Sequence, residues 1–342
     1  MKRLEITLAF MTLFMGFGSN ASAQDFYSNK TLRIVVGFSP GGGMDIYARA
    51  IGRHLGKNIP GKPTMIVENM PGAGSLIAAN YLYNQAKPDG LTIGSWIGGL
   101  VLQQVIGGQK GIEFDARKFE WIGAPAGDSS SCAVSQSSGI STTDQWLAAK
   151  TPVKIGAMAP GSVTSDIPKI LKAALHLPIQ IVEGYKGTAE IRVAADSGEV
   201  DGGCWGWETI KIMWRQGLDS GSTKVLIQML PKRHPDLPDV PNALELAKND
   251  DARQLIKIGI VDPATMVRSL TLPPGTPKDR VKILRDAFMA TMKDPQFLAE
   301  AKTAKLDLNP LPGDEVEKIV HGFFSLPPSV ATKLRDIVVS KN

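Results

Sequence analysis

Glycine-rich turns that lead into helices are the first feature of the sequence that could do chemistry. Pro40-Gly-Gly-Gly-Met-Asp45 follows a β-branched run, and apolar residues recur at helical spacing over 46–55. Glycines let the backbone approach a ligand closely. The N–H groups of a helix's first turn and the helix dipole favour an anion, while Asp45 can accept N–H bonds as a cap. The turn therefore predicts an anion site, with a tight turn that binds nothing as the alternative.

The middle of the chain carries further turns of this kind. Ala159-Pro-Gly-Ser-Val-Thr-Ser-Asp166 begins a helix with several hydroxyl groups, and Gly184-Tyr-Lys-Gly-Thr188 follows the next apolar run. Trp205 and Trp207 lie in the unusual segment Gly203-Cys-Trp-Gly-Trp207. An indole in a cleft can stack on a flat ligand. We expect Trp207 to be a core residue and leave both a cleft and a core position open for Trp205.

Catalytic motifs are missing from the sequence. Gly41-Gly-Gly43 lacks the third glycine of a dinucleotide fingerprint, and Gly56-Lys-Asn-Ile-Pro-Gly-Lys-Pro63 has proline where a phosphate loop needs Ser or Thr. No G-x-S-x-G, H-E-x-x-H or C-x-x-C occurs, and the four histidines are far apart. We therefore expect a protein that is not an enzyme and holds neither a metal nor a cofactor.

The elements that position these turns are strands alternating with helices. Strands are expected over 31–38, 64–68 and 91–96, and helical patterns separate them. The pattern restarts with strands at 132–135, 153–157, 179–183 and 224–227, and helices are expected at about 243–257, 278–291, 295–304, 313–323 and 329–339. This order predicts the α/β class, with two lobes that each contain a mostly parallel sheet flanked by helices. Ligands of such sheets bind beyond the carboxyl ends of the strands.

The beginning of the chain has the layout of a secretory signal peptide. Lys2 and Arg3 precede an apolar run over 6–18, and the small residues Ala21-Ser-Ala23 follow it. We expect cleavage after Ala23 and export to the periplasm, with a membrane anchor as the alternative. The net charge of +5 is spread along the chain without a basic block, so we expect no nucleic-acid partner.

The two cysteines, Cys132 and Cys204, are 72 residues apart. An exported protein meets an oxidising compartment in which they could pair. Two small buried side chains are the alternative, since sequence does not give the distance between them.

Several segments in order resemble one family, the periplasmic solute-binding proteins of tripartite tricarboxylate transporters, known as Bug proteins. The resemblance rests on Ile34–Asp45, Val67–Gly74, Pro88–Gly90, Tyr185–Thr188, Gly198–Asp201, Leu237–Pro241 with Glu245, and Pro274–Pro277. It spans nearly the whole chain after residue 23.

The resemblance implies a two-lobe, closing Venus flytrap fold of the periplasmic-binding-protein type. Residues 1–23 would be the signal peptide, residues 24–124 plus 228–342 the first lobe, and residues 125–227 the second. A ligand carboxylate would be held by backbone groups and waters at two helix-start loops, and bridging waters are nearly as good as direct bonds. The predicted ligand-binding residues are Phe38, Ser39, Pro40, Gly41, Gly42, Gly43, Met44, Asp45, Gly72, Ala73, Gly74, Ser75, Trp96, Pro160, Gly161, Ser162, Thr164, Asp166, Tyr185, Thr188, Asp201 and Trp205.

The function implied is capture of a small mono-, di- or tricarboxylate, aromatic acids included, by a monomer that delivers it to membrane subunits of a transporter. A ligand-sensing adaptor for a signalling partner uses the same binding fold and stays open at this point. An exported hydrolase is the weaker alternative, because no nucleophile and base are visible in the sequence.

Overall fold

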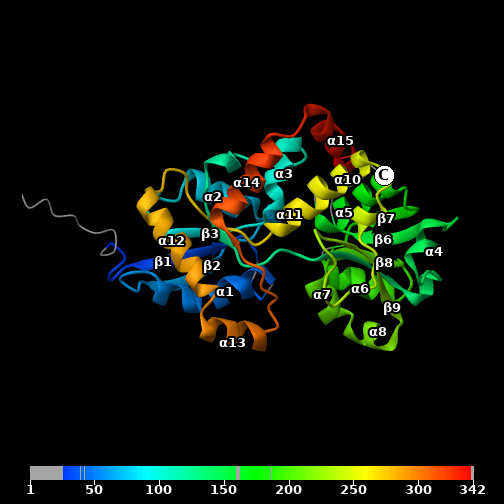
Figure 1. Ribbon diagram of the computed structural model, residues 1–342, viewed down its shortest axis with the longest axis horizontal. Helices are drawn as coiled ribbons and strands as arrows, with labels where there is room; N and C mark the ends of the chain where they lie inside the picture. Colours follow the sequence, from blue (N-terminus) through cyan, green and yellow to red (C-terminus); the bar gives the residue numbers. More distant parts are fainter. Residues whose placement is uncertain (1–25, 39, 42, 159–161, 186, 340–342) are drawn as a thin grey trace, which may run out of the picture.

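Two β-sheets with helices on their faces form two lobes that lie side by side (Figure 1). The computed structural model describes residues 26–38, 40–41, 43–158, 162–185 and 187–339. The expected signal peptide lies outside the described residues, and so do Ser39, Gly42, Pro160 and Gly161 of the predicted site.

The first lobe is built on a mixed sheet with strand order β11-β4-β10-β3-β1-β2. β1 pairs in parallel with β2 and β3, whereas β10 runs antiparallel to β3 and β4. Apolar β-branched residues make β1 a buried central strand. The strands are β1 (Thr31–Val36), β2 (Thr64–Asn69), β3 (Thr92–Ser95), β4 (Glu120–Ala124), β10 (Leu270–Leu272) and β11 (Leu311–Pro312).

Helices cover both faces of this sheet. One face packs on α1, α12 and α13 around a core that contains Ile34, Ile51 and Phe288, and the other face packs on α2, α3 and α14. The helices are α1 (Gly43–Leu55), α2 (Leu76–Asn84), α3 (Gly99–Ile106), α12 (Lys278–Thr291), α13 (Pro295–Thr303) and α14 (Gly313–Phe324).

The second lobe is built on a sheet with strand order β7-β6-β8-β5-β9. β6 pairs in parallel with β7 and β8, and β5 runs antiparallel to β8 and β9. The expected α/β architecture is thus confirmed. Both sheets are mixed, and most of their strands run in one direction: β10 and β11 run the opposite way in the first sheet, and β5 does so in the second. The strands are β5 (Ser130–Ser135), β6 (Val153–Ala157), β7 (Ile179–Glu183), β8 (Gly202–Gly206) and β9 (Thr223–Met229).

The helices of the second lobe also lie on both faces of its sheet. α5 and α10 pack with the face that carries Cys132 and Cys204, whereas α6, α7 and α8 pack with the opposite face around Trp205 and Trp214. The helices are α4 (Thr143–Leu147), α5 (Val163–Leu175), α6 (Thr188–Asp196), α7 (Trp207–Met213), α8 (Arg215–Ser220), α9 (Ala243–Leu246), α10 (Asp250–Ile256) and α15 (Pro328–Val339), and α11 (Asp262–Thr265) follows them in the connection between the lobes.

The chain passes between the lobes at 125–129, again through 257–269, and once more at 325–327. The segment Lys257–Val261 is a π-helix that joins α10 to α11. The sequence division assigned all of 228–342 to the first lobe. In the structure, α9, α10 and α15 pack on α5 of the second lobe, because their apolar faces continue the core on that side of the sheet.

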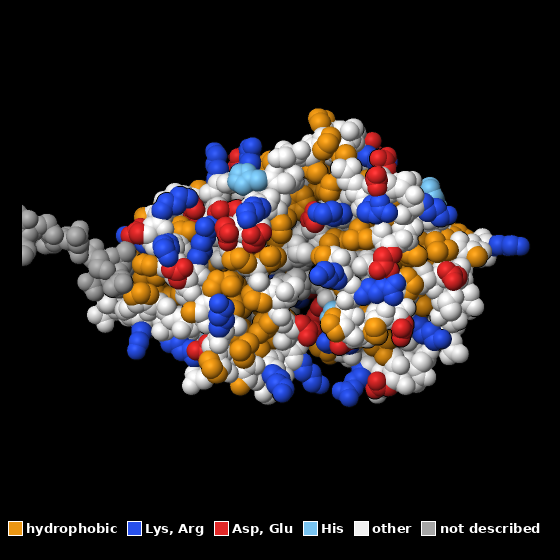
Figure 2. All heavy atoms as spheres, in the orientation of Figure 1, with side chains coloured by type: hydrophobic (Ala, Val, Ile, Leu, Met, Phe, Trp, Pro, Cys, Tyr) orange, Lys and Arg blue, Asp and Glu red, His pale blue; other side chains and the backbone are white. Residues whose placement is uncertain are grey.

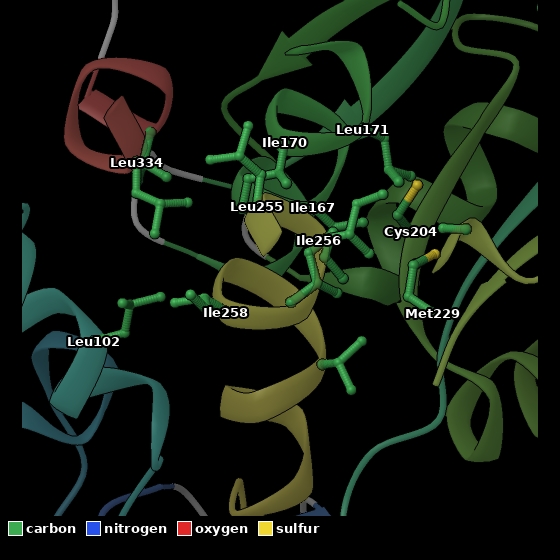
Figure 3. Packing of buried hydrophobic residues seen from close by; sticks show 14 of the residues in the cluster. Leu102, Ile167, Ile170, Leu171, Cys204, Met229, Leu255, Ile256, Ile258 and Leu334 are labelled. Carbon is green, nitrogen blue, oxygen red and sulfur yellow. The ribbon is translucent and has the colours of Figure 1, made fainter. Parts of the chain in front are cut away.

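One core is shared by the two lobes. It includes Leu102 of α3 in the first lobe, Ile258 of the π-helical segment, and Ile170 of α5 in the second lobe. Figure 3 shows Leu102 and Ile258 pointing toward one another, with Leu334 of α15 close to Ile170. No helix within the described ranges is long and apolar enough to cross a membrane.

Candidate functional site

A cavity of about 210 Å³ lies between the lobes. Residues that follow the carboxyl ends of β1, β3 and β6 line it, together with the start of α5 and the connection through the π-helical segment and α11. The surface is hollowed where the two lobes meet (Figure 2). The lining residues are Phe38, Gly74, Ile97, Gly99, Leu100, Leu102, Gln103, Gln109, Asp128, Ser130, Met158, Ser162, Val163, Asp166, Ile167, Gly259, Ile260, Pro263, Ala264 and Val267.

The turn between β1 and α1 is held by the buried carboxylate of Asp45. Its Oδ2 accepts hydrogen bonds from the Gly41 amide at 2.8 Å and from Arg49 Nε at 2.9 Å. Its Oδ1 accepts a hydrogen bond from Asn69 Nδ2 at 2.8 Å. Burial alone would raise the pKa of Asp45, but the hydrogen bonds from Arg49, Gly41 and Asn69 outweigh it and lower the pKa to about 2. Asp45 therefore has a structural role in the turn. The sequence predicted that it accepts N–H bonds from the first turn of the helix, whereas the amide that it binds belongs to Gly41, two residues before α1 begins.

Asn69 at the end of β2 ties this turn to the neighbouring strand. Its Nδ2 also donates to the Phe38 carbonyl at 2.8 Å, and its Oδ1 accepts from Arg49 Nη2 at 2.8 Å. Sequence reasoning did not select Asn69 or Arg49. The signal for Asn69 was a polar side chain at the carboxyl end of a strand, on the edge of the sheet where ligands bind, whereas Arg49 lies on α1 four residues after Asp45.

Several glycines of the predicted site face open space. A Cβ atom added to Gly41, Gly43 or Gly74 would meet no atom within 4 Å, and Gly41 and Gly74 have φ values of +82° and +63°. The backbone at these positions can be approached by a ligand, and the positive φ values explain glycine at two of them. Pro40 beside them is exposed, whereas Met44 is half-buried against the first-lobe core.

The turn between β2 and α2 mixes open and packed positions. The Ala73 carbonyl accepts a hydrogen bond from Gln109 Nε2 at 3.3 Å, and a Cβ on Gly72 would lie 2.4 Å from Ile77 Cδ1. Ser75 is fully buried, and its Oγ accepts a hydrogen bond from the Ile97 amide at 3.0 Å. Ser75 thus joins this turn to the end of β3 and is not exposed to a ligand, which corrects its selection as a contact.

On the second lobe, hydroxyl groups form hydrogen bonds at the start of α5. Thr164 is buried, and its Oγ1 accepts a hydrogen bond from the Met158 amide at 2.9 Å and lies 3.1 Å from Ser162 Oγ. Asp166 lines the cavity and accepts a hydrogen bond from Gln103 Nε2 of α3 at 3.0 Å. This bond links the two lobes directly across the cavity.

An ionic cluster lies beside the cavity where the chain crosses between the lobes. Arg268 Nη2 is 2.6 Å from Asp128 Oδ1, its Nη1 donates to the Gly127 carbonyl at 2.9 Å, and its guanidinium lies 4.7 Å from the centre of the Tyr47 ring. Burial raises the pKa of Glu208 on α7, and the nearby Asp128 carboxylate raises it further. Arg268 therefore compensates the acids on this wall of the cavity.

Three predicted contacts lie away from the cavity. Trp96 is 1% exposed, packs among aromatic rings and donates to Thr271 Oγ1 at 2.8 Å. Trp205 is 4% exposed and stacks on Trp214, so its core alternative is the one found. Asp201 accepts a hydrogen bond from the Lys154 amide at 2.7 Å at the amino end of β8, the edge opposite the cavity. These corrections arise because alternate strand residues face the core and because ligands approach the carboxyl edge.

Two more predicted residues lie at the start of α6 and support it. The Tyr185 hydroxyl donates to Glu199 Oε1 at 2.6 Å, and burial followed by this hydrogen bond raises the pKa of Tyr185 to about 12. Thr188 Oγ1 lies 3.5 Å from Met213 Sδ. Neither residue lines the cavity described above.

Most of the lining residues that sequence reasoning missed come from α3 and from the connection over 259–267, and the others are Ile97, Gln109, Asp128, Ser130, Met158, Val163 and Ile167. The apolar run Gly99–Ile106 directly follows the carboxyl end of β3 and could have been assigned to the site by the same rule as the other turns. The segment 259–267 carries no local signal for a site, since only the fold brings it to the cavity.

The disulfide left open by the sequence is formed between Cys132 and Cys204, whose Cα atoms are 4.1 Å apart. The cysteines are directly opposite one another in the antiparallel pair β5–β8 and are fully buried. Within the described residues, no group of three or more His, Cys, Asp or Glu side chains could hold a metal ion.

Known proteins match most of the chain. The family model described as the tripartite tricarboxylate transporter family receptor matches residues 48–321. A UPF0065 protein from the gbd 5' region of Cupriavidus necator is 30% identical over 295 residues, which covers 85% of this chain and 83% of that protein.

Solved structures share the fold. A TctC solute-binding protein from Polaromonas without ligand is 18% identical, with a TM-score of 0.69 over 90% of this chain and 98% of that one. The periplasmic binding protein BugD is 22% identical, with a TM-score of 0.66 over 92% and 100% of the chains. MatC of Rhodopseudomonas palustris with bound malate is 21% identical, with a TM-score of 0.64 over 90% and 99%. Their two-lobe α/β fold is the fold described here.

Proposed function

The chain belongs to the tripartite tricarboxylate transporter receptor family, and we propose that it is a periplasmic solute-binding protein that captures a small carboxylate between its lobes. The observation that carries the proposal is the cavity at the carboxyl ends of strands from both sheets, with lining residues from both lobes. A ligand that contacts both lobes stabilises their closed arrangement, because it gains contacts there that an open arrangement lacks.

The backbone around the cavity supports an anionic ligand. Gly41, Gly43 and Gly74 leave room for close approach, and the first turns of α1 and α5 direct positive helix-dipole ends toward the same region. MatC, which shares the fold, holds malate, a carboxylate. We propose that the carboxylate of the ligand lies between these two helix starts.

The proposed role is binding without chemistry. The family is one of receptors, which favours binding over hydrolysis. We further propose that the ligand-loaded protein docks on membrane subunits of a tripartite tricarboxylate transporter, and that it acts in the periplasm after cleavage behind Ala23. Sequencing the amino terminus of protein from a periplasmic extract tests the location, and we expect the first residue to be Gln24.

Thermal unfolding in the presence of matched compounds tests ligand capture. A bound carboxylate should raise the melting temperature, since a ligand at one hundred times its Kd adds about 2.7 kcal/mol to the free energy of unfolding. The corresponding amide should give no shift, and NMR should find the acid unchanged after prolonged incubation. A panel of mono-, di- and tricarboxylates without any shift would refute the proposal.

A matched pair of glycine variants locates the site. Gly99 begins α3, lines the cavity, and has no atom within 4 Å of an added Cβ. Gly99→Leu should fill part of the cavity and abolish the thermal shift while leaving the circular dichroism spectrum unchanged. Gly322 on α14 also has free space around its Cβ position and is exposed. Gly322→Leu should bind as the wild type does, and equal binding by both variants would place the ligand elsewhere.

A further inference from the structure

The wall of the interlobe cavity is mainly apolar. Aliphatic and thioether side chains line it from α3, from the end of β6, from α5 and from the connection over 259–267. They include Ile97, Leu100, Met158, Val163, Ile260 and Val267. These side chains gain free energy by contact with the hydrocarbon part of a ligand and form no hydrogen bond with a hydroxyl or second carboxylate group. The uncharged polar residues among the described lining are Gln103, Gln109, Ser130 and Ser162.

The charged side chains among the described lining residues are both acids, Asp128 and Asp166. Asp128 is paired with Arg268 at 2.6 Å, and Asp166 accepts a hydrogen bond from Gln103 at 3.0 Å. No Lys, Arg or His belongs to the described lining. A second ligand carboxylate inside the cavity would therefore lose water without finding a Lys, Arg or His side chain in the described lining to bind it, since Arg268 is already paired with Asp128.

The size of the cavity sets a further limit. At about 210 Å³ it is smaller than the roughly 300–1,000 Å³ typical of pockets for drug-sized ligands. A short acid with a compact hydrocarbon body matches this volume better than a large polar one.

We infer that the cleft selects acids with one carboxylate and an apolar body over di- and tricarboxylates of the same length, an inference that rests on the proposed carboxylate-binding function. The carboxylate would lie at the helix starts and the hydrocarbon part against the wall around Met158 and Leu100. The apolar wall would determine this specificity, and Asp166 would lie beside a second anionic group and weaken its binding.

Isothermal titration with hexanoate and adipate tests the inference directly. The two acids have the same six-carbon length and differ in one end, a methyl group against a second carboxylate. Hexanoate should bind at least tenfold more tightly. Along the series from propionate to hexanoate, affinity should rise by about fourfold per methylene group until the cavity is full, the factor that corresponds to about 0.8 kcal/mol per buried methylene.

The outcomes separate this inference from the proposed function. Adipate that binds as tightly as hexanoate, or affinity that does not change with chain length, overturns the inference while leaving carboxylate capture intact. If none of these acids nor any di- or tricarboxylate binds, both proposals fail.

Two variants with matched controls assign the selectivity to the wall. Met158→Gln should lower the hexanoate-to-adipate affinity ratio several-fold, while Met289→Gln, also half-buried but on α12, should leave the ratio unchanged.

Asp166→Asn should strengthen adipate binding by about threefold to tenfold as the like charge is removed. Asp279→Asn, in the first turn of α12, controls for loss of an acid at a helix start. Ratios that stay constant in Met158→Gln and Asp166→Asn, with native circular dichroism, would overturn the assignment.

Discussion

Asp45 illustrates how one buried carboxylate can hold a ligand-facing turn. It is 2% exposed and accepts hydrogen bonds from the Gly41 amide, Arg49 and Asn69, which together connect β1, α1 and β2. All of its described partners stabilise the charged form. A carboxylate whose pKa is lowered by folding stabilises the protein above the pKa of the unfolded chain, and this contribution is lost as pH falls toward the folded value.

Asp45→Asn should therefore lower the free energy of unfolding at pH 7 by about 1.5–3 kcal/mol, the range for hydrogen bonds to a charged group. The difference from the wild type should shrink as pH falls from 3.8, the ordinary value, toward about 2. Urea unfolding at pH 7 and pH 3 measures both quantities. Asp219→Asn, whose side chain is 74% exposed, should show no comparable loss, and an Asp45→Asn deficit of equal size at both pH values would contradict the account.

At the scale of the element, β8 shows why a glycine-rich strand can be a central one. A Cβ on Gly202 would lie 2.1 Å from the Ala133 carbonyl oxygen of β5, and a Cβ on Gly203 would lie 2.2 Å from the Trp205 ring. Glycine thus permits close packing around this strand. Because glycine has a low preference for strands, the local sequence does not predict a strand here. The alternation of β8 then directs Cys204 to one face of the sheet and Trp205 to the other.

The disulfide between β5 and β8 should stabilise the fold without contributing to binding. The double variant Cys132→Ala/Cys204→Ala should lose about 2–4 kcal/mol of unfolding free energy, because its unfolded chain gains the entropy that the cross-link removes. Urea unfolding with and without reductant measures this effect. Reductant should destabilise the wild type and leave the variant unchanged, while carboxylate affinity stays the same in both. A variant as stable as the oxidised wild type would contradict this role.

The π-helical segment Lys257–Val261, like β8, contains a glycine that allows close packing against a neighbouring element. It continues α10 into α11 and brings Gly259 and Ile260 to the cavity wall. A Cβ on Gly259 would lie 2.6 Å from Ile170 Cδ1 of α5, so glycine lets the segment pack closely on that helix. π-Helical turns inside α-helices are frequent at functional sites, in keeping with this position between the lobes.

At the scale of the whole molecule, the two lobes share a hydrophobic core as well as a cavity. The core that contains Leu102, Ile258 and Ile170 runs from one lobe to the other (Figure 3), and α15 covers it from the end of the chain. Lys211 of α7 forms an ion pair with Asp307 at 3.0 Å on the rim of the interface. We expect contacts of this extent to couple the stability of the lobes.

The shared core predicts one cooperative unfolding transition. Leu284 of α12 is fully buried in a core confined to the first lobe, and Leu284→Ala should cost about 2–5 kcal/mol. Hydrogen exchange followed by mass spectrometry should find the slowest amides of β6 in the second lobe deprotected as much as those of β1. Leu298→Ala, at a 42% exposed position, serves as the control. Unchanged protection of β6 in Leu284→Ala would mean that the lobes unfold separately.

The sequence by itself determined the local elements and the family. Hydrophobic periodicity predicted α12 at 278–291 and β6 at 153–157, the bounds that the structure has. The prediction succeeded because α12 buries one apolar face and β6 is a short apolar strand, and both patterns are visible in the local sequence. Of the ligand contacts predicted from turns at strand ends, Phe38, Gly74, Ser162 and Asp166 line the cavity, and their contact with a ligand stays a prediction. The ordered motifs identified the family that the comparisons then established.

Only the tertiary structure decided the rest. The pairing of Cys132 with Cys204, the core positions of Trp96 and Trp205, and the arrival of 259–267 at the cavity depend on contacts between segments far apart in the chain. Local sequence carries no information about such distances. The apolar character of the cleft arises in the same way, since α3, α5 and the interlobe connection bring their aliphatic side chains together only when both lobes are folded.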